Sequence, residues 1–493
     1  MKIKPTKLIS LFFIFLFVSP NLSAQGFYRQ GDWISYTVFR YVTSMATDFD
    51  HVYFGTTGGV LRYNRTHRNW ESPFTISDGL MDNRVRRVAY DSDKDELWFD
   101  TRSGVCMYKP IFQTWYIGGD FPENLVQSNK DNTPLPAFFM DYGYHFFPEG
   151  YITDLYLNRY PVTDYYLDDW DDLWIGTWGL NAGIGSLRDL ELEMFKFGLY
   201  DSDVNAICLD RGVIWAGGRG FYQDAEAITR FVRAKNLWEY FQSDRINGLE
   251  TSQVNVIETD SLYVWFGSEN GLARYDKKKK DWITYTTFSG LRDDWVSTLK
   301  SDEEVLWIGT KWGLNYYWSD KDTLGYFRNE LVNNTYIFSV EADSQWVWVG
   351  TEWGVARMDK STGDWFRFNT PDGILNSPIR SITRNKNVLW FGTDSGILSY
   401  DLLSSKRKVY QAKVNFPGQD IRKILCDDKN LWVATFQGVW KMDLKTEVWR
   451  LFDKNDGLLD DNVQDMVLDG DFIWFGTPEG LTRFFWNSPY RID

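Results

Sequence analysis

Three tryptophans at equivalent points of a repeated phrase are the side chains of this sequence best suited to contact a ligand. Trp178, Trp312 and Trp353 each follow a strand-like phrase and precede a glycine, so each should lie in a tight turn. An exposed indole face suits the apolar C–H surface of a sugar ring. The alternative is that each indole covers the neighbouring repeat. Trp295 and Tyr336 immediately precede expected strands and carry the same two interpretations.

Paired acidic residues supply a second kind of candidate chemistry. Asp293-Asp294 and Asp460-Asp461 stand in equivalent loops, where two carboxylates could act as acid and base or bind calcium. Aspartate is also an ordinary residue of tight loops, and the segment 453–457 lacks the spacing of a calcium-binding loop. The sequence therefore predicts no catalytic or metal-binding set. The candidates for ligand binding are Trp178, Trp295, Trp312, Trp353, Tyr336, Asp294, Asp461, Asn462 and Arg102.

Histidine and cysteine are too few for the common catalytic and metal sites. The three histidines fall in different parts of the repeat pattern and form no evident triad or zinc site: His51, His67 and His145. The three cysteines include no CxxC pair, and their odd number argues against a disulfide framework: Cys106, Cys208 and Cys426. We expect buried free thiols, no cofactor and no enzymatic activity.

The first 24 residues have the features of a secretion signal. Lys2, Lys4 and Lys7 precede the apolar run 8–18, and small residues up to Ala24 offer a cleavage site. No cysteine follows that site, so we expect no lipid anchor, and no second apolar run is long enough to span a membrane. The sequence predicts a periplasmic or secreted protein.

Cleavage of the signal would leave a strongly acidic chain. The 493 residues include 53 Lys and Arg and 68 Asp and Glu; without the signal, 50 basic residues face 68 acidic ones, a net charge of −18. Nucleic acids and strongly anionic polysaccharides need basic surfaces, so the charge disfavours both unless a local basic pocket exists. We interpret the acids as keeping an exported protein in solution.

Ten copies of one phrase set the architecture. Each copy runs aliphatic, aromatic, apolar, small, small, and ends in a glycine turn, as in Val264-Trp265-Phe266-Gly267-Ser268. The last five intervals between copies are 42, 41, 42, 42 and 42 residues, and so regular a period indicates a stack of repeated units. The anchor aromatics of the ten copies are Tyr53, Trp98, Trp174, Trp215, Trp265, Trp307, Trp348, Trp390, Trp432 and Trp474.

Within each period the pattern predicts four short antiparallel strands. From Leu291 to Tyr317, alternating segments are separated by a polar turn and a tight glycine turn. An aliphatic residue precedes the anchor by 11 positions in eight copies, and a further tryptophan follows it by 17 in five. Four strands in a period of this length are typical of one blade of a β-propeller.

The two ends of the chain complement each other. The last copy lacks a fourth strand, whereas Asp32-Trp33-Ile34-Ser35-Tyr36 looks like a fourth strand with no first three. Joining them would close a ring and remove its open edges. The sequence thus predicts an all-β fold in which residues 25–493 form a single closed β-propeller of about ten four-stranded blades, with nine to eleven allowed. Residues 118–160 interrupt the period as an insertion or a degenerate blade.

The repeat resembles that of the two-component regulator propeller family. Val264 to Ser268 followed by Gly271-Leu272-Ala273-Arg274-Tyr275-Asp276 matches the family's phrase, as does the copy from Leu389 to Asp401. The resemblance covers essentially all of the chain after the signal. It implies a bacterial periplasmic sensor propeller that binds glycan fragments. No sandwich domain, membrane helix or kinase follows the repeats in this sequence, which favours a detached binding propeller.

Three functions are compatible with these residues. The favoured one is an exported, non-enzymatic propeller that binds an oligosaccharide or peptide through its turns and channel-entry loops. The second is a cell-envelope scaffold that binds another protein, and it predicts a broad exposed apolar or charged face. The third, a glycan hydrolase or lyase, needs converging acids or a histidine at the channel mouth and is the least favoured.

Overall fold

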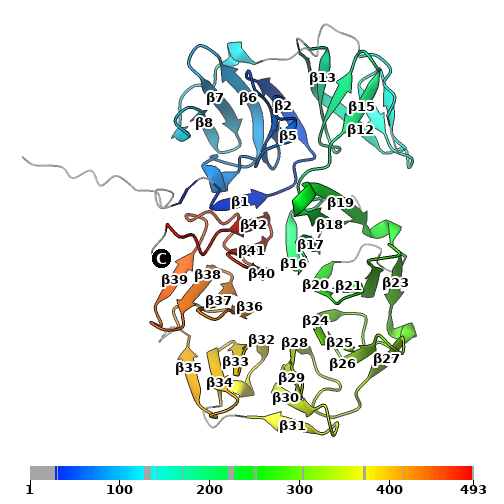
Figure 1. Cartoon of the computed structure of the whole chain (residues 1–493), viewed down its shortest axis with the longest axis vertical. Coiled ribbons are helices and arrows are strands. Elements are labelled where there is room, and N and C mark those ends of the chain that lie inside the picture. The colour runs from blue at the N-terminus through cyan, green and yellow to red at the C-terminus, as the bar shows by residue number, and fades with distance from the viewer. Residues whose placement is uncertain are drawn as a thin grey trace, which may run out of the picture.

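The computed structural model describes residues 28–490 except 30, 127–134, 141–142, 169, 220–226, 248, 250–252, 303–304, 370–372, 413 and 415. The described strands form ten antiparallel sheets, nine of four strands and one of six. These sheets separate into two units (Figure 1). We term the larger one the ring and the smaller one, drawn in blue to teal, the flanking unit.

The repeated phrase forms the second strand of a sheet and the turn that follows it. Trp265 is fully buried, and its indole N–H donates to the Asp260 carboxylate at 2.7 Å. The hydroxyl of Ser268 donates to the carbonyl oxygen of Gly271 at 3.0 Å and closes the turn. Gly271 has a φ of 129°, which residues with a side chain rarely adopt. The small hydroxyl residue and the glycine of the phrase are therefore both required by this turn.

The ring consists of seven four-stranded sheets. The first four comprise β16 (Asp203–Asp210), β17 (Val213–Arg219), β18 (Ala227–Val232) and β19 (Leu237–Gln242); β20 (Val254–Thr259), β21 (Tyr263–Ser268), β22 (Gly271–Asp276) and β23 (Trp282–Tyr285); β24 (Val296–Asp302), β25 (Val305–Thr310), β26 (Gly313–Trp318) and β27 (Thr323–Tyr326); and β28 (Ile337–Ala342), β29 (Trp346–Thr351), β30 (Gly354–Asp359) and β31 (Trp365–Phe368).

The remaining three sheets of the ring follow in chain order, and the last one also takes a strand from the N-terminal end. They comprise β32 (Ile379–Asn385), β33 (Val388–Thr393), β34 (Gly396–Asp401) and β35 (Arg407–Gln411); β36 (Lys423–Cys426), β37 (Asn430–Thr435), β38 (Gly438–Asp443) and β39 (Trp449–Phe452); and β40 (Asp465–Asp469), β41 (Phe472–Thr477), β42 (Gly480–Phe484) and β1 (Trp33–Tyr36). Short 3-10 helices occur between strands at η4 (Arg233–Lys235), η5 (Ser243–Arg245), η6 (Thr287–Ser289) and η7 (Ile374–Asn376).

The first and last sheets of the ring contact each other directly. The inner strands touch in the order β16, β20, β24, β28, β32, β36 and β40, and both β40 and β41 contact β16. Each contact sets the glycine of the phrase against the first aliphatic residue of the next sheet, so that a Cβ on Gly309 would lie 2.7 Å from Ile337. Gly476 of the last sheet meets Val204 of the first sheet in the same way. These seven sheets therefore close on themselves (Figure 1).

The N-terminal strand completes the last sheet, as the sequence predicts. β1 pairs antiparallel with β42, and Trp33 lies opposite Phe484 in this pairing. Trp33 is 3% exposed and its ring stacks on Phe484 with the centroids 3.9 Å apart. The last sheet thus contains strands from both ends of the described chain.

The flanking unit is a stack of three sheets in which the third sheet of the chain lies next to the first, because β2 contacts β12 and β13 on one side and β6 on the other. Its sheets comprise β2 (Val42–Thr47), β3 (His51–Thr56), β4 (Gly59–Asn64) and β5 (Asn69–Trp70); β6 (Val85–Asp91), β7 (Glu96–Thr101), β8 (Gly104–Lys109) and β9 (Thr114–Ile117); and β10 (His145–Phe147), β11 (Tyr151–Thr153), β12 (Arg159–Leu167), β13 (Asp172–Thr177), β14 (Ala182–Ser186) and β15 (Glu191–Met194). The helix η2 (Ile76–Asp78) follows β5, and η3 (Glu123–Leu125) follows β9.

The stack ends where the repeated phrase loses its glycine. Gly176 of the third sheet packs against Val42 of the first, and Gly55 of the first packs against Val85 of the second. The equivalent residue of the second sheet is Asp100, whose carboxylate accepts two hydrogen bonds from Arg87 at 3.0 and 2.8 Å. A carboxylate does not pack against the aliphatic residue of a further sheet without a large desolvation cost. Here η3, not a further sheet, contacts β6.

Residues 118–160 contribute two strands to the third sheet. β10 pairs with β11, and β11 pairs with the first residues of β12. The described part of this segment therefore extends an existing sheet on the side of β12 and forms no separate four-stranded sheet.

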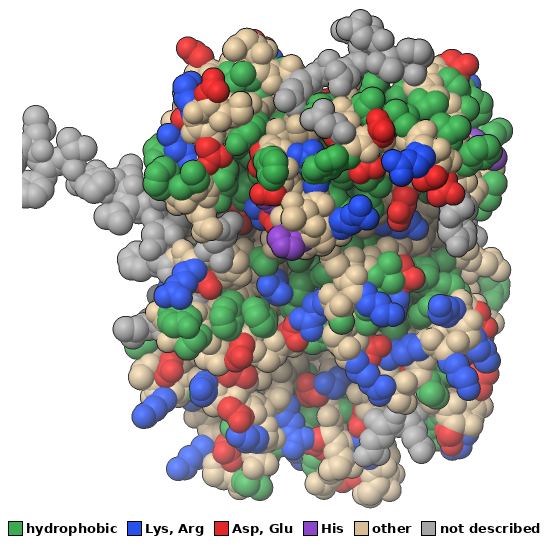
Figure 2. Space-filling model, turned by 45° about the horizontal axis from the view of Figure 1, so that its top comes forward, with side chains coloured by type: hydrophobic (Ala, Val, Ile, Leu, Met, Phe, Trp, Pro, Cys, Tyr) green, Lys and Arg blue, Asp and Glu red, His purple; other side chains and the backbone are tan. Residues whose placement is uncertain are grey.

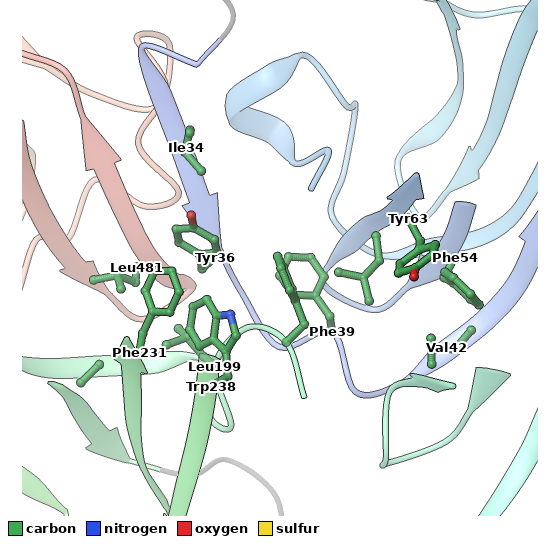
Figure 3. Close-up of a cluster of buried hydrophobic side chains, with 14 of the residues drawn as sticks. Ile34, Tyr36, Phe39, Val42, Phe54, Tyr63, Leu199, Phe231, Trp238 and Leu481 are labelled. Carbon is green, nitrogen blue, oxygen red and sulfur yellow. The ribbon is translucent and has the colours of Figure 1, made fainter. Parts of the chain in front are cut away.

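Two connecting segments join the ring to the flanking unit. Residues 37–41 lead out of β1 and residues 195–202 lead into β16, and Val38 pairs with Gly198 in an isolated antiparallel bridge between them. Phe39 is fully buried and lies between Trp238 of the ring and Tyr63 of the flanking unit (Figure 3). One continuous hydrophobic cluster therefore runs through both units.

The single propeller of about ten blades predicted over residues 25–493 is wrong. Every copy of the phrase makes the same kind of sheet, so the period does not report which sheet follows which in space. The number of blades in a closed ring depends on the twist and packing between neighbouring sheets. Here seven sheets already return to the starting point, and the other three form a separate stack between β1 and β16.

Features outside the repeats have different outcomes. The three cysteines are free, and two of them are buried, as predicted. The predicted signal peptide, residues 1–24, lies outside the described residues. No helix in the part of the chain that is described is long and apolar enough to cross a membrane.

Candidate functional site

The turns after the second strands and the loops before the first strands share one face of the ring, as predicted. The backbone N–H of Lys311, in the β25–β26 turn, donates to the carbonyl oxygen of Trp295 at 3.1 Å. The N–H of Glu352, in the β29–β30 turn, donates to that of Tyr336 at 3.3 Å. These bonds bring predicted residues of neighbouring sheets together around the end of the channel between the inner strands, which we term the channel mouth.

The three turn tryptophans do not form one surface. Trp312 and Trp353 lie on neighbouring sheets of the ring and are 53% and 66% exposed, but neither ring contacts another aromatic ring within the described residues. Trp178 belongs to the flanking unit, where its ring lies 5.0 Å from that of Tyr41. The two exposed indoles of the ring remain candidates for ligand contact, whereas Trp178 is placed apart from them.

Trp295 and Tyr336 line the channel mouth with part of their surface buried. The ring of Tyr336 stacks on Phe338 with the centroids 4.4 Å apart. Burial raises the pKa of Tyr336, and hydrogen bonds from Trp295 and Ser297 reach its hydroxyl. The Nζ atom of Lys311 lies 5.3 Å from the centroid of the Trp295 ring. These contacts build an aromatic wall at the mouth.

The acidic candidates organise their own loops. Asp294 accepts a hydrogen bond from the backbone N–H of Thr287 at 2.6 Å, and Asp461 accepts the equivalent bond from Lys454 at 2.8 Å. Their neighbours act in the same way, since Asp293 accepts from the N–H of Trp295 at 2.8 Å. Such bonds are the usual role of aspartate in tight loops. The adjacent pairs therefore hold loop backbone, and neither pair faces the other.

Asn462 and Arg102 occupy positions of different character. The N–H of Asn462 donates to Asp460 at 2.9 Å, while its buried Oδ1 accepts no hydrogen bond from the described residues. Arg102 lies in the flanking unit, where its Nε–H donates to Asp82 at 3.0 Å. It also lines a groove between the two units that includes Lys454 and Glu479 of the ring. Arg102 is thus brought near the ring although it is not part of it.

Sequence reasoning missed four residues of the mouth, namely Phe338, Arg380, Arg422 and, as a partner of Arg422, Phe436. The first three come directly after the aliphatic residue that lies 11 positions before an anchor. This position varies from copy to copy while its neighbours repeat, which was the signal that could have identified it. In several sheets it coincides with a register shift between the first two strands, as between Ile337 and Ser339, so that its side chain is directed away from the sheet pairing.

A cavity of about 190 Å³ opens between the ring and the flanking unit, beside the connecting segments. We term it the junction cavity. Arg40 and Tyr200 come from the connecting segments, Asn181 comes from the β13–β14 turn, and Tyr240 comes from the first sheet of the ring. Its aromatic walls are made largely by five tyrosines, Tyr144, Tyr156, Tyr160, Tyr200 and Tyr240.

Hydrogen bonds hold the tyrosine walls in place. The Nε2–H of Gln242 donates to the hydroxyl of Tyr200 at 2.7 Å, and the Tyr240 hydroxyl donates to the carbonyl oxygen of Gly198 at 3.1 Å. The Tyr160 hydroxyl donates to Asp154 at 3.1 Å. Burial raises the pKa of both Tyr160 and Tyr240. Both hydroxyl groups therefore stay protonated at neutral pH and keep these bonds.

The junction cavity is basic although the whole chain is acidic. The guanidinium of Arg40 is buried and lies 4.1 Å from the centroid of Tyr200, and that of Arg245 lies 4.3 Å from the centroid of Tyr156. Asp154 is the only carboxylate among the described residues that line it. Burial alone would raise the pKa of Asp154, but hydrogen bonds led by those from Asn158 lower it. The local basic pocket that the overall charge required is therefore present.

Asn181 brings an unused hydrogen-bond acceptor to the junction cavity. It is 3% exposed and adopts a φ of 70°, in the left-handed region. Its Nδ2–H donates to the carbonyl oxygen of Phe197 at 3.3 Å, whereas its Oδ1 is buried and accepts no bond from the described residues. A buried amide oxygen without a donor costs free energy. A donor on a bound ligand would remove that cost.

Figure 2 views this side of the molecule and shows how the two units differ at the surface. Hydrophobic side chains gather over the flanking unit at the top, whereas lysines, arginines and acids alternate over the ring. Among the described residues, no group of three or more His, Cys, Asp or Glu is placed to hold a metal ion.

The three histidines line neither the junction cavity nor the channel mouth. His51 begins β3, where its Nδ1 lies 3.3 Å from Asp48 and its Nε2 lies 3.3 Å from Glu71. Hydrogen bonds to Asp48 and Glu71 raise the pKa of His51 to about 9, and the pKa of Glu71 falls to about 2. At neutral pH His51 is therefore an imidazolium that stabilises the flanking unit.

Replacing His51 by glutamine should destabilise the protein in a pH-dependent way. Because the folded pKa of about 9 exceeds the ordinary 6.5, the contribution of the charged form is complete below pH 6.5 and is lost as the pH rises through 9. We expect H51Q to lower the free energy of unfolding by about 1 to 2 kcal/mol near pH 6 and by much less near pH 10. Urea unfolding of both proteins measures this, and an equal difference at the two pH values would contradict the ion pair.

Comparison with known proteins concerns the fold. No family model and no curated protein matches the chain. PorZ, an essential bacterial surface component of the type-IX secretion system of Porphyromonas gingivalis, is 16% identical with a TM-score of 0.50, over 90% of this chain and 74% of that one. The extracellular domain of a putative hybrid two-component system from B. thetaiotaomicron is 16% identical with a TM-score of 0.48, over 92% and 71%. Virginiamycin B lyase from Staphylococcus aureus is 15% identical with a TM-score of 0.45, over 57% and 94%. This chain therefore has a propeller-type fold of the kind found in extracellular sensor and surface domains.

Proposed function

We propose that this chain is an exported, non-enzymatic propeller of the two-component regulator type, which binds the end of an oligosaccharide in the junction cavity. Tyrosine faces suit the C–H surface of a sugar ring. Arg40 and Gln242 offer donors beside them, and Asn181 offers an acceptor. The unused Oδ1 of Asn181 is the observation that carries the proposal, because a sugar hydroxyl is a donor that would satisfy it.

The position of the cavity gives binding a consequence for the whole molecule. Its walls come from both units and from the segments that connect them. A ligand held there contacts the ring and the flanking unit at once, so it stabilises one arrangement of the two. A propeller that reports the presence of a glycan needs such a dependence of shape on ligand.

A thermal-shift screen of the chain against oligosaccharides and short peptides tests this function. A ligand that binds the folded state raises the midpoint of unfolding with its concentration. We expect a rise with an oligosaccharide that is lost in Asn181→Gly, since glycine keeps the φ of 70° and removes the amide. Trp312→Ala, at the channel mouth, is the matched control and should keep the rise.

Three outcomes would decide against this proposal. A rise only with peptides would make the ligand a peptide. A rise that survives Asn181→Gly but disappears in Trp312→Ala would move the site to the channel mouth. Turnover of any glycan would replace binding by catalysis.

A further inference from the structure

One variable side chain per sheet stands at the channel mouth of the ring, directly after the first aliphatic residue. In sheet order these residues are Asn205, Asn255, Ser297, Phe338, Arg380, Arg422 and Gln464. The two arginines are on neighbouring sheets, since β32 contacts β36. The mouth is therefore unequal around its circumference, with its positive charge on one side.

Arg380 is fixed in place between an acid and an aromatic ring. Its Nε and Nη2 donate to the two carboxylate oxygens of Asp394 at 2.9 and 3.2 Å. Its guanidinium lies 4.6 Å from the centroid of Phe338, which in turn stacks on Tyr336. The two-bond fork and the stacked ring hold the guanidinium in one orientation. Asp394 is thereby committed to Arg380.

Arg422 stands beside this pair without an acid of its own. Its guanidinium lies 3.9 Å from the centroid of Phe436, and it has no carboxylate partner within the described residues. Partial burial lowers the pKa of Arg422, and the positive charge of Arg380 lowers it further. Two like charges close together repel each other. An anion placed against Arg422 would relieve that repulsion.

We propose that the channel mouth of the ring is a docking surface for an acidic peptide segment of a partner protein, whose carboxylates pair with Arg422 and Arg380. A guanidinium presents two parallel N–H groups to a carboxylate. The surroundings have the composition of protein-binding surfaces, which are rich in exposed tryptophan, aromatic and arginine side chains. Trp312, Trp353 and Phe436 are 53%, 66% and 47% exposed here.

Charge complementarity distinguishes this surface from the rest of the molecule. The formal net charge of the whole chain is −15, so an acidic peptide is repelled everywhere except at a local basic site. The nearby acids have other partners: Asp394 binds Arg380, and Glu352 accepts from the Thr335 hydroxyl at 3.1 Å. The site is distinct from the junction cavity, because none of these residues lines that cavity.

Fluorescence anisotropy with a labelled hexaglutamate peptide tests the docking surface on the full chain. We expect saturable binding that weakens with salt, and a loss of about tenfold in affinity in Arg422→Gln because one charge-assisted contact disappears. Phe436→Ala, which removes the ring beneath that guanidinium, should also weaken binding and keeps the test available if Arg422→Gln fails to fold. Lys278→Gln makes the same charge change in the turn between β22 and β23, on the opposite face, and should leave affinity unchanged.

The following results would overturn the docking surface. Hexaglutamate could fail to bind at low salt, or a neutral hexaserine peptide could bind as tightly. Lys278→Gln could weaken binding as much as Arg422→Gln, which would indicate diffuse electrostatics. Asn181→Gly should leave hexaglutamate binding intact, so failure here and failure of the junction cavity to bind a glycan are separate findings.

Discussion

Replacing Gly476 by aspartate should prevent the ring from closing and lower the free energy of unfolding by about 4 kcal/mol or more. A Cβ at this position would lie 2.7 Å from the carbonyl oxygen of Val204 and 2.9 Å from its Cγ1. The first and last sheets of the ring would have to move apart, and a carboxylate would be buried between them. Urea unfolding and limited proteolysis of G476D measure the effect.

The matched control makes the opposite change at the equivalent residue of the flanking unit. Asp100→Gly gives the second sheet the usual phrase but has no neighbouring sheet to fill. We expect a change of less than about 1 kcal/mol, since only the bonds to the partly exposed Arg87 are lost. A G476D protein as stable as D100G would contradict the assignment of the first and last sheets as neighbours.

The architecture of each sheet was readable from the sequence because the phrase is a local code. Trp265, Ser268 and Gly271 have a buried ring, a hydroxyl that closes the turn and a positive φ, and each role needs that residue type. The pairing of Trp33 with the last sheet also followed, because an incomplete blade at one end matched an unpaired strand at the other. These inferences depend on short-range spacing and on edge satisfaction alone.

The number of blades in the ring was not readable from the period, although one residue carried a signal. Asp100 is the only anchor phrase in which the glycine position holds a charged residue, and it marks the end of the flanking stack. The glycine at this position fits the aliphatic residue of the next sheet, so its loss indicates that no sheet follows. Period counts repeats, whereas contacts between sheets decide which repeats share a ring.

The candidate sites divide in the same way. Trp312 and Trp353 were placed correctly in exposed turns, since their position within the phrase is local. The junction cavity was not foreseen, because Arg40, Asn181 and Tyr240 come from three segments that meet only through the arrangement of the two units. A departure from the phrase did point there. Thr177 donates to the carbonyl oxygen of Asn181, four residues on instead of three, so this turn carries one extra residue.

Trp33→Ala should be the largest loss available from a single truncation at the closing sheet. Trp33 is 3% exposed and stacks on Phe484, and it also lies against Phe452 and Phe475. Removing a buried tryptophan ring leaves a cavity and costs about 3 to 5 kcal/mol. The loss acts on β1, which joins the N-terminal end to the last sheet through a pairing of only four residues.

Trp312→Ala is the control for the Trp33 variant, because it removes the same side chain from a surface position that is 53% exposed. We expect it to change the free energy of unfolding by less than about 1 kcal/mol. Hydrogen exchange adds a spatial readout: in W33A the amides of β1 and β42 should lose protection before those of β28 to β31, which lie across the ring. Uniform loss of protection would mean that β1 does not act as the closing strand. Selective loss at β1 and β42 would show that the ring is closed by the one strand that precedes the flanking unit, so that the chain cannot complete the ring until both units have been joined.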